Sequence, residues 1–105
     1  MNLQMIIKSC LEYIDNTIIP NCSAFKIGKT GQLPQDRFSA EEYKSHNHQV
    51  LQSSKSKTNI SILEALLIAH YQNHPKCRNE RGALASFHDD MTSTTGEYHL
   101  YIVWN

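Results

Sequence analysis

Apolar residues recur at helical spacing near the N-terminus and again in the second half of the chain. Residues 2–15 carry their apolar side chains on one face, which predicts an amphipathic helix. Residues 60–73 are apolar on most sides, with Asn59 as a suitable N-cap and Pro75 just beyond the last turn. The pattern therefore predicts two long helices, of which the second is largely buried.

A shorter helix is predicted between these two. Ser39 and Glu42 have the spacing of a capping box, so we expect a helix from Ser39 to about His46. Stretches that are polar or rich in Gly and Pro are predicted as connecting segments: residues 16–21, 28–34, 53–58, 79–82 and 92–96.

Alternating apolar residues predict the strands. Residues 98–104 give the clearest pattern, residues 23–29 alternate less regularly, and residues 49–53 are a brief third candidate. We expect the strands near Phe25 and Leu100 to pair although they lie far apart in the chain. The prediction is one domain spanning residues 1–105, an α/β or α+β fold in which three helices flank a small, mostly antiparallel sheet.

The distribution of charge along the chain indicates where a polyanion would bind. The chain has 105 residues and a formal net charge of zero, so it is large enough for one modest core and has no overall field that attracts polyanions. Residues 26–57 nevertheless carry more cations than acids. Any site for a polyanion should therefore lie in the middle of the chain.

Cysteine usage and hydropathy bear on the compartment. Three cysteines without a CxxC pair and without a secretory signal favour a reducing environment. No stretch approaches the roughly 18 apolar residues that cross a membrane. We expect a soluble, cytoplasmic protein with no membrane association.

Glu64 and Arg37 are the most informative side chains. Glu64 lies on the most apolar helix, where a carboxylate either faces solvent or is paired in a functional cavity. One carboxylate, with waters and phosphate oxygens, can hold Mg²⁺. Arg37 can form two parallel hydrogen bonds to a phosphate, although the neighbouring Asp36 offers a local ion pair as well.

Lys26 and Lys29 flank Gly28 at the predicted end of a strand. The glycine would let a phosphate approach the backbone closely, but the pattern of a Walker A loop is absent. A lysine-bearing hairpin end is the alternative. In an extended strand the two lysines point to opposite faces, unless a turn at the glycine reorients Lys29.

Two further groups of residues could carry chemistry. His70, His74 and Cys77 have a spacing compatible with zinc, but they are more typical of a helix end that favours cations. A tyrosine hydroxyl at a metal site can act as a general base, and the sequence leaves five candidates: Tyr13, Tyr43, Tyr71, Tyr98 and Tyr101.

Taken in order, these residues resemble the GIY-YIG nuclease superfamily, in a branch whose second motif reads Lys-Ile-Gly-Lys-Thr. The resemblance covers about residues 24–82: the segment Phe25–Thr30, then Arg37, then the helical residues 62–68 that contain Glu64, and finally Asn79 followed by Gly82. The order and spacing of these short motifs carry the resemblance.

The resemblance implies roles for these positions. Arg37 would bind the scissile phosphate, Glu64 would ligate Mg²⁺ or Mn²⁺, and Gly28 and Asn79 would support the site. Lys26 and Lys29 would help to bind the substrate. The family's first motif has no match before Phe25, so Tyr98, which opens the C-terminal strand, is our candidate for the catalytic phenol.

Three interpretations follow. The chain is a metal-dependent endonuclease acting on nucleic acid, most simply DNA, or a domain of the same fold that binds nucleic acid or protein without catalysis. The third is an unrelated interaction domain. A chain this small would need a homodimer or a partner protein for sequence specificity. The nuclease interpretation expects Arg37 and Glu64 to share one pocket.

Overall fold

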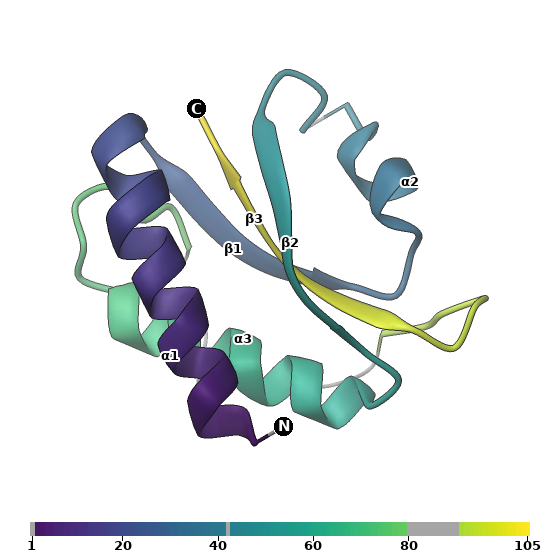
Figure 1. Cartoon of the computed structure of the whole chain (residues 1–105). Helices are drawn as coiled ribbons and strands as arrows, with labels where there is room; N and C mark the ends of the chain where they lie inside the picture. Colours follow the sequence, from purple (N-terminus) through teal and green to yellow (C-terminus); the bar gives the residue numbers. More distant parts are fainter. Residues whose placement is uncertain (1, 42, 80–90) are drawn as a thin grey trace.

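The computed structural model describes residues 2–41, 43–79 and 91–105. A three-stranded antiparallel sheet runs through its centre, with β3 (Tyr98–Trp104) between the other two strands (Figure 1). β1 (Phe25–Thr30) and β2 (Asn47–Ser54) both pair antiparallel to β3. The predicted pairing of the strands near Phe25 and Leu100 is confirmed.

Helices cover both faces of the sheet. α1 (Leu3–Tyr13) and α3 (Lys57–Tyr71) pack together on one face, and the short α2 (Pro34–Phe38) lies on the other (Figure 1). This arrangement confirms the predicted α+β class. No helix in the described part of the chain is long and apolar enough to cross a membrane.

The N-terminal helix continues further than the sequence indicates. Asn2 caps α1 through a hydrogen bond from the Met5 amide, and the chain then remains coiled in a π-helix, Ile14–Ile18, and a 3₁₀ turn, Ile19–Asn21. The predicted connector at residues 16–21 is therefore wrong. Ile14 and Ile18 are fully buried, and this continued coil keeps both of them against the core.

The predicted helix from Ser39 to His46 is also wrong. The helix lies earlier, in α2, where Pro34 occupies the first turn and supplies a helical φ without losing a needed donor. Ser39 follows the last helical residue, and its amide bonds to the Gln35 carbonyl. Glu42, the other half of the predicted capping box, lies outside the described residues.

α3 begins earlier than predicted. Ser56 rather than Asn59 is the N-cap, and its hydroxyl accepts the Asn59 amide hydrogen at 3.2 Å. The helix ends at Tyr71, shortly before Pro75. Gly28, predicted to lie in a turn, is an inner residue of β1, and β2 is longer than predicted, with an irregularity at Leu51.

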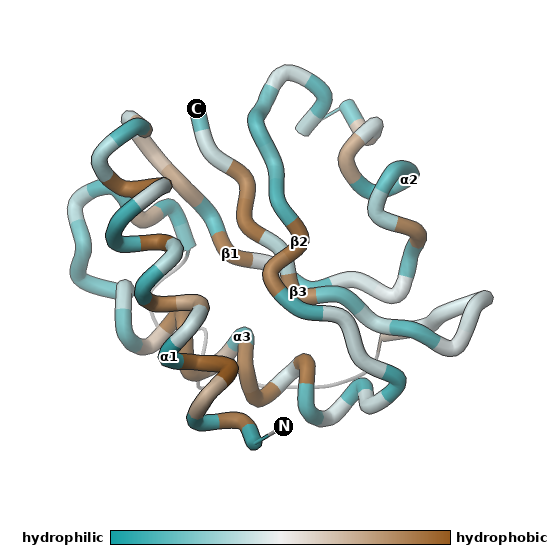
Figure 2. The backbone as a smooth tube through the Cα atoms, viewed as in Figure 1, coloured by the Kyte–Doolittle hydropathy of each residue, from teal (hydrophilic) through white to brown (hydrophobic). Residues whose placement is uncertain are grey.

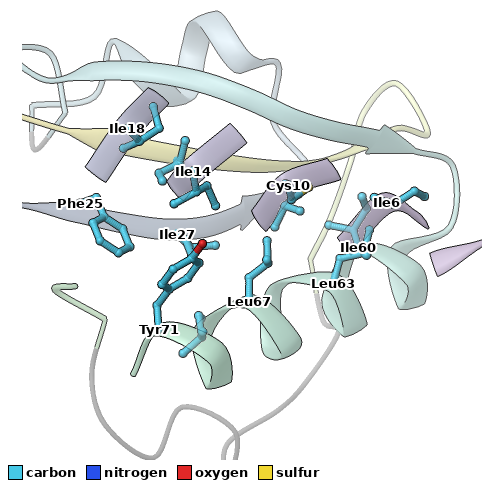
Figure 3. Packing of buried hydrophobic residues seen from close by; sticks show 13 residues of the cluster. Ile6, Cys10, Ile14, Ile18, Phe25, Ile27, Ile60, Leu63, Leu67 and Tyr71 are labelled. Carbon is cyan, nitrogen blue, oxygen red and sulfur yellow. The ribbon is translucent and has the colours of Figure 1, made fainter. Parts of the chain in front are cut away.

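The main hydrophobic core lies between the sheet and the helices α1 and α3. Phe25 and Ile27 of β1 meet Leu67 and Tyr71 of α3, and all four are almost completely buried (Figure 3). Hydrophobic positions are concentrated on these helices and in the middle of the sheet, whereas the start of β2 and the loop before β3 are hydrophilic (Figure 2). A smaller cluster on the opposite face contains Phe38, Tyr43, Tyr101 and Val103.

Candidate functional site

Arg37 is held by two tyrosines on the α2 face of the sheet. Its Nε donates a hydrogen bond to the Tyr101 hydroxyl at 3.1 Å, and its Nη2 donates to the Tyr43 hydroxyl at 3.4 Å. The guanidinium carbon also lies 4.7 Å from the centre of the Tyr43 ring. A guanidinium fixed in this way loses little further freedom when it binds an anion.

Gly28 makes room for Tyr101. The two residues are paired across β1 and β3, and a Cβ on Gly28 would lie 2.4 Å from the Tyr101 Cζ and 2.5 Å from its hydroxyl oxygen. Any side chain at Gly28 would displace the ring. The missing side chain therefore allows the phenol to lie across β1, which brings the Arg37 cluster to the edge of the sheet.

Burial raises the pKa of Tyr101 well above its ordinary value. Interactions with Tyr43 raise this pKa further, and Arg37 opposes the shift. The phenol is therefore neutral at physiological pH. In this environment its hydroxyl accepts the Arg37 hydrogen bond and is also hydrogen-bonded to Tyr43.

Lys29 and Glu64 form a second cluster, on the α3 face. Lys29 Nζ lies 3.7 Å from Glu64 Oε1 and donates a hydrogen bond to the Ser61 hydroxyl at 3.0 Å. The side chains of Lys29 and Glu64 are only 10% and 19% exposed. Of the two environments that the sequence left open for Glu64, the structure shows the paired one.

Asn79 closes the outer edge of β1 just before these residues. Its Oδ1 accepts the Ile27 amide hydrogen at 2.9 Å, and its Nδ2 donates to the Ile27 carbonyl at 2.8 Å. One side chain thus replaces a neighbouring strand for this residue. Asn79 lies in a supporting position and fixes the backbone that leads into Gly28 and Lys29.

Arg37 and Glu64 do not share the single pocket that the nuclease interpretation expects. Their clusters lie on opposite faces of the sheet, because Gly28 turns toward Tyr101 while Lys29 turns toward α3. A shared pocket for Arg37 and Glu64 would have excluded the third interpretation, an unrelated interaction domain. The structure does not show such a pocket. The two clusters nevertheless flank two consecutive residues of β1, which is an edge strand of the described sheet.

Tyr98 does not belong to the Arg37 cluster. It packs against the core between α1 and α3, on the face that also carries Glu64. The phenols that contact Arg37 are Tyr101 and Tyr43, which the sequence offered only among five candidates. The register of β1 against β3 would have singled out Tyr101, but the sequence predicts the pairing without its register.

The remaining lysine of the predicted site, Lys26, is exposed on the same face as Gly28. Lys26 and Lys29 therefore point to opposite faces, as their spacing predicts. Lys26 lines a pocket of about 220 Å³ together with Tyr43 and Arg78. Because Tyr43 also contacts Arg37, this pocket adjoins the Arg37 cluster, on the side nearer the start of β1.

The fit of a divalent ion to this site is limited. Among the described residues no three His, Cys, Asp or Glu side chains lie close enough together to bind a metal, and this includes the His70, His74 and Cys77 group. Glu64 offers one carboxylate with an ammonium group beside it. An ion held there would keep most of its water ligands and depend on phosphate oxygens, which Mg²⁺ tolerates.

A larger hollow lies elsewhere. It measures about 320 Å³ and is lined by residues of α1 and β2, among them Tyr13, one of the five candidate tyrosines, but by none of the residues to which the resemblance gives a role. Cys10 is among its lining residues, and burial raises the pKa of this thiol, which makes it a poor nucleophile. We therefore identify the site by its charged groups rather than by volume.

No protein-family model, curated protein or solved structure matches the chain. Any function of this chain is therefore inferred from its own residues and their contacts.

Proposed function

We propose that this protein is a metal-dependent endonuclease of the GIY-YIG type that hydrolyses phosphodiester bonds at the edge of β1. One observation carries the proposal. An arginine held by two phenols and a carboxylate paired with a lysine flank the same dipeptide, Gly28–Lys29. The GIY-YIG resemblance involves the same positions, together with Asn79, which fixes the adjoining backbone.

Each residue has a physical role in this proposal. Arg37 binds the phosphate through its fork of donors and stabilises the charge that develops there. The neutral Tyr101 accepts a hydrogen bond from Arg37 and so orients its guanidinium toward the phosphate. Lys29 adds a second positive charge on the far side of the strand.

Glu64 is the proposed ligand of Mg²⁺ or Mn²⁺, which would supply further positive charge at the phosphate. Lys29 must then give up part of its contact with the carboxylate. The three free cysteines agree with a reducing compartment, and we propose the cytoplasm. A homodimer or a partner protein would supply specificity, and DNA is the proposed substrate.

The second candidate function is binding of nucleic acid at the same surface without hydrolysis. It is favoured by the Lys29–Glu64 ion pair, which occupies the carboxylate, and by the location of Arg37 and Glu64 on opposite faces. Both candidates predict salt-sensitive binding that depends on Arg37. Only the first predicts strand cleavage.

Incubation of the purified protein with plasmid and single-stranded DNA, with Mg²⁺, Mn²⁺ or a chelator, separates the two candidates. We expect cleavage that requires the ion and falls by at least about a hundredfold in Glu64→Gln, as for other groups that stabilise developing charge. Glu12→Gln, an exposed change on α1, is the matched control and should cleave like the wild type. Binding without cleavage would favour the second candidate.

A further inference from the structure

A pocket adjoins the Arg37 cluster at the start of β1. Its volume is about 220 Å³, and its walls include Ala24 and Lys26 of the chain around β1, Val103 of β3, and Tyr43 with His46 from the turn before β2. The Tyr43 ring connects the pocket to the site, because it also contacts the Arg37 guanidinium. A group in this pocket would lie next to a phosphate bound at Arg37.

We infer that this pocket holds one unpaired nucleobase of a single-stranded nucleic acid. The inference rests on the proposed function for the position of the neighbouring phosphate. The volume lies below the roughly 300–1,000 Å³ typical of pockets for drug-sized ligands, so it suits a single flat ring system and not a complete nucleotide.

The chemistry of the walls supports a base. Tyr43 supplies an aromatic wall, and Val103 supplies an apolar one. His46 Nδ1 is buried and has no hydrogen-bond partner among the described residues. Such orphaned groups are rare in folded proteins, and a base edge would satisfy it after a small turn of the imidazole.

The charges around the pocket suit the backbone of the same strand. Lys26 and Arg78 are both exposed and both line the pocket, so they can contact a phosphate next to the bound base. Lys26 lies two residues from Gly28 on β1, a separation of about 7 Å. The strand would therefore run along β1 from Lys26 toward Arg37, with its phosphates outward and one base in the pocket.

A double strand fits this surface poorly. A base within a duplex is paired and stacked, and its removal costs a few kcal/mol. The protein has a formal net charge of zero, so it has no general attraction for a duplex that would compensate this cost. Base stacking has to contribute to the affinity, which favours single strands.

Fluorescence anisotropy tests the inference with the full chain and no divalent ion, so that cleavage plays no part. The probes are a labelled single strand, the matched duplex, and the same strand with abasic residues. We expect the wild type to bind the intact strand about tenfold more tightly than either other probe, as the loss of one stacked base implies.

A pocket-filling variant sharpens the test. Ala24→Leu should weaken binding of the intact strand to the level of the abasic strand and leave abasic binding unchanged. Ser23→Leu, an exposed change at the adjacent position that does not line the pocket, should bind all three probes like the wild type.

Equal affinity of the wild type for intact and abasic strands would overturn the inference, and so would binding of the duplex as tightly as the single strand. These outcomes need no variant, so they hold even if Ala24→Leu fails to fold. Cleavage of DNA without base-dependent binding would remove the inference and leave the proposed function. Base-dependent binding without cleavage would remove the proposed function and leave the inference.

Discussion

The two faces of the sheet use similar residue types for different purposes. On the α1 and α3 face, Phe25, Ile27 and Leu67 lie in a continuous apolar core. The hydroxyl of Tyr71 on this face donates a hydrogen bond to Asp15 at 2.7 Å. On the α2 face, the phenols of Tyr43 and Tyr101 are instead the acceptors for an arginine. Hydrocarbon packing dominates the first face, whereas hydrogen bonds to a cation dominate the second.

This difference indicates where the molecule can change without unfolding. The α2 face has a small apolar cluster and a charged group at its centre, so a change there costs less packing than a change in the main core. β1 contributes to both faces: Gly28 leaves room for the Tyr101 ring on the α2 face, and the Lys29 side chain contacts Glu64 on the α3 face.

Removal of a core side chain should have the largest effect on stability. Leu67 is fully buried, so Leu67→Ala should lower the free energy of unfolding by about 2–5 kcal/mol through lost burial and a new cavity. Leu66, the neighbouring residue, is 49% exposed, and Leu66→Ala should cost well under half as much. Urea unfolding of both variants measures the difference. Equal losses would show that the main core is not where the structure places it.

A methyl group at Gly28 should affect the second face more than the first. Gly28→Ala would force the Tyr101 ring away from β1, at a cost of about 1–3 kcal/mol in stability. The ring would also leave Arg37, so we expect weaker binding of nucleic acid. In a Tyr101→Ala background the same change should cost much less. Purely additive losses in this double-mutant cycle would contradict the contact.

Alkaline pH should weaken both faces through their buried phenols. Burial is the main cause that raises the pKa of both Tyr71 and Tyr101. Asp15 raises the pKa of Tyr71 further, and Tyr43 raises that of Tyr101. The folded state therefore keeps both phenols neutral at a pH where the unfolded chain ionises them. Their contribution is complete below pH about 10 and declines above it, by up to about 1.4 kcal/mol per pH unit for each.

Urea unfolding at neutral pH and at steps above pH about 10 measures this slope. Tyr71→Phe should remove the contribution of one phenol and make the slope shallower, without touching Arg37. A slope identical to that of the wild type would mean that Tyr71 ionises as readily in the folded protein as in the unfolded chain.

Much of the fold could be predicted from periodicity. The positions of α1, α3 and β3 follow from apolar spacing over many residues, and the alternation along β3 agrees with the two clusters into which its side chains pack. The errors lie where tertiary contacts decide. Pro34 starts α2 before the Ser39 capping box, and buried Ile18 extends the first helix through a segment that looks like a connector.

The site was less predictable because it depends on strand register. Glu64 and Arg37 stand out by residue type and sequence context. In the structure Glu64 is paired with Lys29, and Arg37 is hydrogen-bonded to Tyr101. Tyr101 matters through its position opposite Gly28, and a shift of one residue in the pairing would turn it to the other face. No local pattern contains that information, so the sequence alone points to Tyr98, the tyrosine nearest the start of the strand.

The central claim is that groups on both sides of β1 act on one phosphodiester, and a kinetic cycle tests it most directly. Rates of DNA cleavage with Mg²⁺ are measured for the wild type, Arg37→Gln, Glu64→Gln and the double variant. Groups that act as a unit give a double variant no slower than the worse single variant, which is the result we predict. Wild-type cleavage by Glu64→Gln, or losses that multiply as for two independent sites, would contradict the claim.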